Sequence, residues 1–233
     1  MNLIQRHRSA PRPGPARRAV RLGLLATVGL TVVATTAATA QAVTVPGAAY
    51  GVAVADNTVH TLADPGRPSE FQDSFTVHQY GVLHAAALRN QAEAQSWACA
   101  ADSPCRSVAL SFQIVTMAGE DIHLNAENVS HAANHDCAGC QTLAGAWQFI
   151  VSTPEPFTLS PAARRQLDGI RRELDALGRS AAPVASVQQQ ADALAAQVVS
   201  VLSGAAEAAP RRPGMSAMAV GAPTVTVHRM LAG

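Results

Sequence analysis

The sequence predicts an α/β or α+β domain in which a small sheet of tandem helix–strand repeats, of βαβ type, precedes a C-terminal helical hairpin. Two similar segments lie 35 residues apart, and each contains apolar residues alternating with small or polar ones. Two stretches of helical periodicity follow. The expected divisions are residues 1–42, a signal peptide; 43–73, a hairpin or linker; 74–158, the cysteine-containing repeats; 159–203, the helical hairpin; and 204–233, a disordered tail.

The repeat becomes visible when Cys105 is aligned with Cys140 without a gap. Residues 105–115 then match residues 140–150. A third, weaker copy begins at Ser74, with Gln79 in the place of Gln113. The matching positions are Ala109 with Ala144, Phe112 with Trp147, Gln113 with Gln148, Asn90 with Asn125 and Ala98 with Ala133.

Each repeat is expected to be a helix that leads into a strand. Residues 107–114 and 142–151 alternate with a period of two, which is typical of strands. Between them, Asn125 can cap a short helix that ends near His135. Units connected in this way favour parallel strands with the helices on one face. Before the repeats, residues 52–55 and 58–62 flank Asp56 and Asn57, which predicts a hairpin.

The helical hairpin is predicted from start and stop signals and from periodicity. Ser160 suits an N-cap, Pro161 fits the first turn, and Gly178 can end the first helix. A second helix is expected from about residue 184 to residue 202. The apolar residues at helical spacing are Leu167, Ile170, Leu174 and Leu177 in the first helix and Val187, Ala191, Leu194, Val198 and Val201 in the second.

Residues 1–42 have the features of an export signal. Six arginines precede an uncharged stretch, residues 22–40, and no acidic residue occurs before that stretch ends. Small residues up to Ala40 and Ala42 match the pattern that signal peptidase cleaves. The alternative is an uncleaved anchor, because the stretch approaches the length of a membrane span. We therefore expect a secreted or extracytoplasmic protein, in contact with the membrane only through this segment if it is not cleaved.

Cleavage would also change the charge of the chain. The full sequence has 17 basic and 16 acidic residues; without the six arginines 11 basic residues remain, and the net charge becomes −5. A mildly acidic domain without a basic cluster is not expected to bind nucleic acid.

Four cysteines, an even number in an exported chain, predict two disulfides. Cys137 precedes Cys140 by three residues, and in the first copy Cys99 lies about one helical turn before the matching position. Both copies can then connect the end of a helix to the start of the next strand, which predicts Cys99–Cys105 and Cys137–Cys140. A bridge between the two copies is the alternative.

A metal or thiol-redox site is the competing hypothesis for this region. His131, His135, Cys137 and Cys140 offer two imidazoles and two thiols, and histidines at i and i+4 share a helix face. The two cysteines also have the spacing of a redox pair. An oxidising compartment and the lack of matching ligands in the first copy argue against a metal site. A reactive thiolate usually lies at a helix N-terminus, whereas Cys140 leads into a predicted strand, which argues against a redox pair. No cofactor is therefore expected.

Catalytic motifs are absent from the sequence, which contains no HExxH, GxSxG or phosphate-binding loop. We accordingly assign no catalytic residue. Gln113 and Gln148 occupy equal positions in the two strands, beside small residues, and can line a polar groove. A solvated or helix-covered sheet face is the alternative for this pair.

The region from about Asn90 to Leu177 resembles a known family. Its features are a Cys-x2-Cys pair before an alternating strand with Ala and Gln, an Asn-led helix and a Leu-Ser-Pro helix start. They are similar to the extracytoplasmic C-terminal region of actinobacterial peptide zinc metalloprotease proteins, in which such units recur with paired cysteines. The zinc-binding HExxH motif and membrane-embedded core of that family have no counterpart in this sequence. The resemblance therefore implies an accessory domain without protease activity.

These observations predict an exported, non-enzymatic module that binds a protein partner or has a structural role at the cell surface. The open sheet face or the helical hairpin would meet this partner. The alternative function is a metal-binding or thiol-redox protein that uses His131, His135, Cys137 and Cys140. A hydrolase of another type is the third possibility.

Overall fold

The structure is a computed structural model and describes residues 51–209 and 222–233. Strands hold 54% of these residues and helices 24%. Both helices follow the fifth strand, so the predicted α/β or α+β sheet of tandem helix–strand repeats is wrong. The elements are, in chain order, β1 (Gly51–Ala63), β2 (Ser69–Trp97), β3 (Arg106–Ala118), β4 (His123–His135), β5 (Gln141–Thr153), α1 (Pro161–Leu177), α2 (Val184–Glu207) and β6 (Thr224–Ala232).

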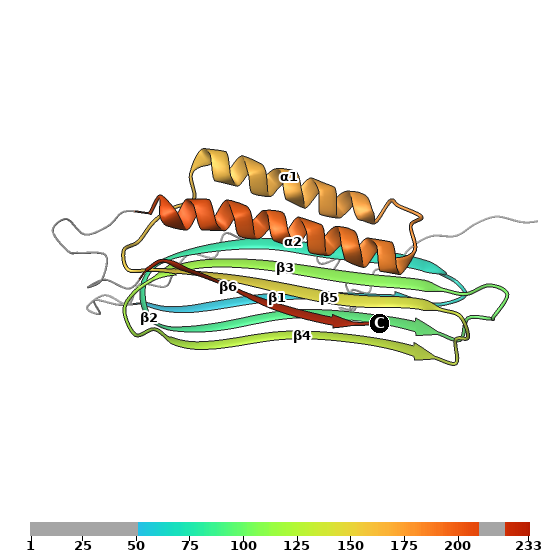
Figure 1. The fold of residues 1–233 in the computed structure, drawn as a ribbon. Coiled ribbons are helices and arrows are strands. Elements are labelled where there is room, and N and C mark those ends of the chain that lie inside the picture. The colour runs from blue at the N-terminus through green and yellow to red at the C-terminus, as the bar shows by residue number, and fades with distance from the viewer. Residues whose placement is uncertain (1–50, 210–221) are drawn as a thin grey trace, which may run out of the picture. The chain divides into compact units, whose positions relative to one another are not determined.

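The long strand β2 belongs to two sheets, because the chain bends near residues 79–82, where its register shifts. Its second half pairs in parallel with β1 and with β4, and we call these three strands the outer sheet. Its first half pairs in parallel with β3, β3 pairs in parallel with β5, and β5 pairs antiparallel with β6. We call this second group the middle sheet. Helices α1 and α2 pack on its far side, so the fold has three layers (Figure 1).

The strands follow one another in coils. β1 and the first half of β2 form the first coil, the second half of β2 and β3 the second, and β4 and β5 the third. Each coil contributes one strand to the outer sheet and one to the middle sheet, an arrangement called a β-solenoid. Residues 35 apart lie side by side where β3 pairs with β5, and Cys105 and Cys140 precede these two strands. The paired strands of the coils are parallel, as expected, but strands rather than helices connect them.

Two segments predicted to have other structures are strands of the outer sheet. The short helix expected after Asn125 is β4, whose partner along its whole length is the second half of β2. The hairpin expected around Asp56 and Asn57 is the single strand β1. Asparagine favours turns and helix caps when only the local sequence is considered. In both segments, however, the backbone hydrogen bonds to the neighbouring strand β2 outweigh this local preference.

The two central strands of the middle sheet, β3 and β5, are buried on both faces and form the core. Large side chains point toward the helices, where the rings of Phe75 and Phe112 stack with centroids 5.9 Å apart and the tilted ring of Trp147 packs on Phe112 at 4.8 Å. Gly145 makes room for this stack, since a Cβ atom there would lie 2.5 Å from the Trp147 ring. Small and polar residues point toward the outer sheet. They include Ser107, Ala109, Ser111, Thr142, Ala144 and Ala146, all buried.

The two helices begin close to where the sequence predicts. The side chain of Ser160 caps α1 by accepting a hydrogen bond from the Ala163 N–H. Gly178 follows α1 in right-handed helical conformation, so a left-handed C-cap is not its role. A Cβ atom there would lie 2.3 Å from the ring of Phe71. The predicted apolar stripes are buried except that Leu202 takes the place of Val201 in α2.

The predicted disordered tail is partly ordered. Helix α2 continues to Glu207, and residues 224–232 form β6. The guanidinium of Arg229 on β6 donates two hydrogen bonds, of 2.7 and 2.6 Å, to the carboxylate of Asp192 on α2. Asp192 also accepts from the Trp147 indole at 3.2 Å. These contacts hold β6 against both α2 and β5.

The predicted signal peptide, residues 1–42, lies outside the described residues. Within residues 51–209 and 222–233, neither helix has the length and apolar character needed to cross a membrane.

Candidate functional site

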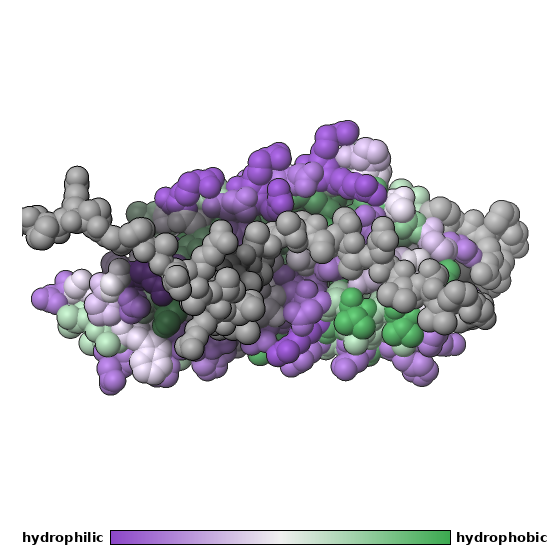
Figure 2. All heavy atoms as spheres, turned by 180° about the vertical axis from the view of Figure 1, so that it is seen from behind, coloured by the Kyte–Doolittle hydropathy of each residue, from purple (hydrophilic) through white to green (hydrophobic). Residues whose placement is uncertain are grey.

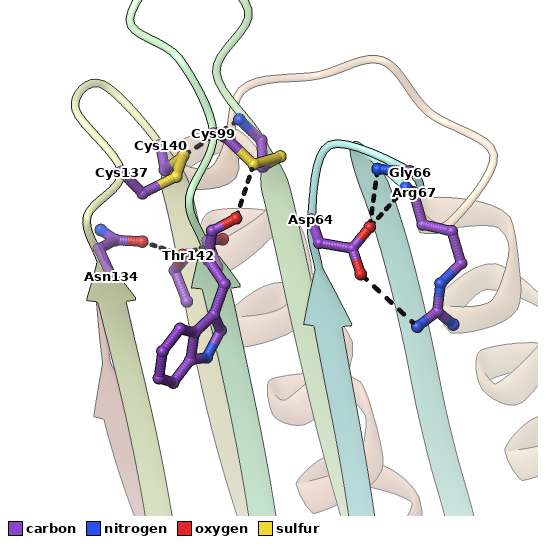
Figure 3. The surroundings of a disulfide bond; sticks show 11 residues. Asp64, Gly66, Arg67, Cys99, Asn134, Cys137, Cys140 and Thr142 are labelled. Carbon is purple, nitrogen blue, oxygen red and sulfur yellow. Dashed lines mark hydrogen bonds and ion pairs between the residues drawn. A yellow bond between two sulfur atoms is a disulfide. The ribbon is translucent and has the colours of Figure 1, made fainter.

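The four cysteines lie in the turns that lead from the outer sheet to the middle sheet (Figure 3). Cys99 is bonded to Cys105 between β2 and β3, and Cys137 to Cys140 between β4 and β5. This is the pairing that the sequence favoured, and the bridge between copies does not form. The turns contain no helix end, however: each disulfide connects the end of an outer strand to the start of a middle strand.

Successive turns are stacked, and the first turn uses a carboxylate where the others use a disulfide. Between β1 and β2, the carboxylate of Asp64 accepts hydrogen bonds from the Gly66 and Arg67 N–H groups, both at 2.8 Å. The Cys105 N–H donates to Sγ of Cys140 at 3.1 Å, which connects the second turn to the third. The Arg106 N–H donates to the Pro68 carbonyl at 2.8 Å, which connects the first turn to the second, so the turns hold the ends of the three coils in register.

The metal and redox hypothesis does not fit this geometry. His131 and His135 lie four residues apart on a strand, and a rise of about 3.3 Å per residue separates them too far to share an ion. The ring of His135 instead stacks on Trp97, with centroids 4.1 Å apart. The sulfur atoms of Cys99, Cys137 and Cys140 approach within 4.8 Å of one another, but all belong to disulfides and offer no thiolate.

Gln113 and Gln148 do not line a groove. Both are 0% exposed and lie between the two sheets. Nε2 of Gln148 donates to Oε1 of Gln113 at 2.8 Å, and Nε2 of Gln113 donates to the Arg89 carbonyl of the outer sheet at 2.8 Å. The pair therefore holds the two sheets together.

A ladder of asparagines, which the sequence analysis missed, lies beside the glutamines. Asn57, Asn90 and Asn128 occupy adjacent positions on β1, β2 and β4. Their carboxamides form a chain of hydrogen bonds through the interior, and Asn90 is completely buried. Because buried polar groups must be paired, these contacts are structural.

The exposed surface of the outer sheet is the best candidate for a functional site. We call the side that points away from the middle sheet the outer face. Neighbouring strands are about 4.8 Å apart, so its side chains form rows across the three strands. The rows are Val52, Ala85 and His123; Val54, Ala87 and Asn125; Asp56, Arg89 and Glu127; Thr58, Gln91 and Val129; His60, Glu93 and His131; Leu62, Gln95 and Ala133; and Trp97 with His135.

The rows combine charges of both signs with an aromatic side chain. Arg89 lies 3.6 Å from Glu127, and Nδ1 of His60 lies 3.1 Å from Glu93. Trp97 is 44% exposed, and its indole N–H donates to Gln95 at 3.0 Å. This hydrogen bond and the stacking on His135 fix the orientation of the indole.

A cavity beside the bend of β2 and the carboxyl group of Asp73 are weaker candidates for a functional site. An open cavity of 680 Å³ lies between the bend of β2, the start of α1 and the end of α2. The polar group of Gln79 at its wall is already engaged, since its Oε1 accepts from the Leu159 N–H at 2.7 Å. None of the predicted site residues lines this cavity.

The carboxyl group of Asp73 points toward α1 and has an altered acidity. Burial raises its pKa to about 7, helped by the hydrogen bond and negative charge of Asp175, while Arg171 acts in the opposite direction. The pair lies under the helix, on the opposite side of the middle sheet from the outer face. Burial also lowers the pKa of His78 and raises that of Tyr80, both between the sheets.

Comparison with protein-family models, with curated proteins and with solved structures finds no match for this chain. The resemblance to the metalloprotease-associated region therefore stays a prediction.

Proposed function

We propose that the chain is an exported, non-enzymatic module that binds a protein partner at the cell surface through its outer face. The observation that supports this most directly is the distribution of apolar side chains. Of the seven exposed large apolar side chains among the described residues, four lie on the outer face. These four are Val52, Val54, Leu62 and Trp97.

The other surfaces are less suited to a protein partner. The central strands of the middle sheet, β3 and β5, are covered on both sides. In the view of Figure 2 the upper, helical side is mostly hydrophilic, whereas hydrophobic groups lie among hydrophilic ones lower on the strand layers. An aromatic anchor, apolar side chains and charges of both signs are the composition of a protein-binding surface. Nucleic acid would require a basic surface, and the outer face carries Arg89 as its only arginine against Asp56, Glu93 and Glu127.

The two disulfides are consistent with an extracytoplasmic location, because such bonds persist in oxidising compartments. Export by the N-terminal segment is part of the proposal. N-terminal sequencing of protein collected outside the cytoplasm tests it, with cleavage after Ala40 or Ala42 expected. Protein found only in the cytoplasm would contradict it.

Photo-crosslinking in the native host tests the binding surface. A benzophenone amino acid replaces Gln91 at the centre of the outer face or, as a control, Arg172 on the exposed side of α1. We expect one protein to crosslink from position 91 and not from position 172. That protein, once purified, should bind the mature chain, and Trp97→Ala should weaken binding about tenfold. No product from position 91, or the same products from both positions, contradicts the proposal.

A further inference from the structure

At the edge formed by β4, the outer sheet ends before the middle sheet beneath it does. Nδ2 of Asn128 on β4 donates to two carbonyls, those of Ala146 on β5 and His228 on β6, both at 2.9 Å. Because β5 and β6 are neighbours in the middle sheet, β4 must lie above the gap between them. β6 therefore extends beyond β4 and leaves a ledge, which we define by Thr226, His228 and Met230.

The side chains on this ledge point into the layer of the outer sheet. Met230 pairs with Ala146 and His228 with Gln148, and both partners face the outer sheet. Met230 is nevertheless 47% exposed, and Leu124 on β4 is 44% exposed. The hydroxyl of Ser130, also on β4, is buried without a hydrogen-bond partner. The two inward-facing but exposed apolar side chains, Met230 and Leu124, are the feature expected beside an unfilled strand position.

The edge of β4 is open to pairing. Within residues 51–209 and 222–233, β4 pairs only with β2. It has 13 residues, contains neither proline nor lysine, and pairs with β2 without a bulge. Natural proteins usually protect a free edge strand with a proline, a lysine or a bulge, or cover it with another segment.

The ledge also decides which occupant fits. A second copy of this chain whose middle sheet lies on the same side cannot place its β4 alongside, because its own β6 would need the same space as the first β6. An extended segment without a ledge of its own meets no such obstacle. Glu127, half-exposed on the outer side of β4, favours a basic residue directly opposite it.

We propose that β4 receives a strand from the protein partner: an extended peptide that pairs with its free edge and lies on the ledge. Apolar side chains at alternate positions of the peptide cover Met230 and Leu124, and a basic side chain on the other face meets Glu127. Backbone hydrogen bonds give the affinity and these alternate contacts give the specificity. The inference rests on the proposed function and names the form of the partner.

A synthetic probe tests this inference with the folded chain. The probe is a nine-residue peptide in which valine alternates with arginine and threonine, and its control has proline at alternate positions. Hydrogen exchange should show that the valine peptide protects amides within residues 123–135, while the proline peptide does not. Protection elsewhere, or β4 amides that are already fully protected in the free chain, would overturn the inference. The latter result would mean that another part of the chain occupies the position.

Two matched pairs of variants locate the contact by fluorescence anisotropy of the labelled peptide. Met230→Asp should weaken binding about tenfold or more, as expected when an apolar contact is lost. Val227→Asp, on the opposite face of β6 and 40% exposed, should leave it unchanged. Glu127→Arg should weaken binding, and Asp56→Arg, in the same row on β1, should not. Equal effects within a pair contradict the inference. A partner that crosslinks from position 91 but never protects β4 leaves the proposed function intact and refutes strand addition alone.

Discussion

The carboxamide of Asn90 donates a hydrogen bond to Oδ1 of Asn128 at 2.8 Å and accepts one from Nδ2 of Asn57 at 3.1 Å. It also accepts from the hydroxyl of Ser111 at 2.6 Å and donates to the Trp147 carbonyl at 3.1 Å. Asn90 therefore connects all three strands of the outer sheet to the middle sheet. A slip of one residue would turn these carboxamides to the opposite face, so the ladder fixes the register.

Asn90→Asp should be strongly destabilising at neutral pH. The substitution keeps the shape but removes the donor and places a negative charge among carbonyl and carboxamide oxygens. We expect a loss of about 3 kcal/mol or more in the free energy of unfolding, measured by urea denaturation. The exposed Asn125→Asp is the control and should change it by less than about 0.5 kcal/mol. Similar losses for the two variants would show that the ladder does not stabilise the fold.

The sequence permits prediction of the helices and middle strands but not of the outer sheet. Ser160 and Pro161 mark the start of α1 locally, and β3 and β5 alternate clearly. The segments 85–97 and 123–135 consist largely of Ala, Asn, Gln and His, which have weak strand preference. They become strands because successive coils of the solenoid place them side by side. The gapless alignment also slips in this region. The disulfide in the second turn spans six residues and that in the third spans three, so Asn90 meets Asn128 and not Asn125.

The candidate site was missed for the same reason. The outer face exists only when three outer strands align, which places Arg89 beside Glu127 and Trp97 beside His135. No motif marks these residues individually. The offset between paired residues also differs from one pair of strands to the next: it is 33 between β1 and β2 (Asp56 and Arg89) and 38 between β2 and β4 (Arg89 and Glu127), so a single repeat length does not align the outer strands.

Gly178→Ala should destabilise the chain through a steric clash. The added Cβ atom would lie 2.3 Å from the ring of Phe71, although the backbone conformation suits alanine. We expect a loss of about 1–3 kcal/mol by thermal or urea denaturation. Gly204→Ala in α2, where nothing lies within 4 Å of the new atom, should stabilise by about 0.5–1 kcal/mol. Phe71→Ala alone also costs stability because Phe71 packs on the core. A double-mutant cycle therefore isolates the clash: Gly178→Ala should cost less in the Phe71→Ala background than in the native chain, and an equal cost in both would exclude the clash.

Removing the disulfides should have unequal effects. Both close short loops, so each should contribute about 1–3 kcal/mol through the entropy of the unfolded chain. Cys99 and Cys105 are 3% and 1% exposed, whereas Cys137 and Cys140 are half-buried. Replacing the first pair by alanine should therefore cost more stability than replacing the second.

A thiol titration of the untreated protein should find no free thiol among the four cysteines; four free thiols with bound zinc would contradict the disulfides.

The acidity of Asp73 should make stability depend on pH in a defined direction. Burial and Asp175 raise its pKa in the folded chain to about 7, above the ordinary value of an unfolded aspartate. The folded state thus favours the protonated form, so the contribution of Asp73 is fully present below about pH 4 and is lost as the pH rises to about 7. Relative to Asp73→Asn, the native chain should become less stable across this window, with no further change above it. Urea denaturation at pH 4, 5.5 and 8 measures the difference. The control is Asp168→Asn, on the exposed side of α1, the helix that carries Asp175. A difference between native chain and Asp73→Asn that is the same at all three pH values would contradict the shift.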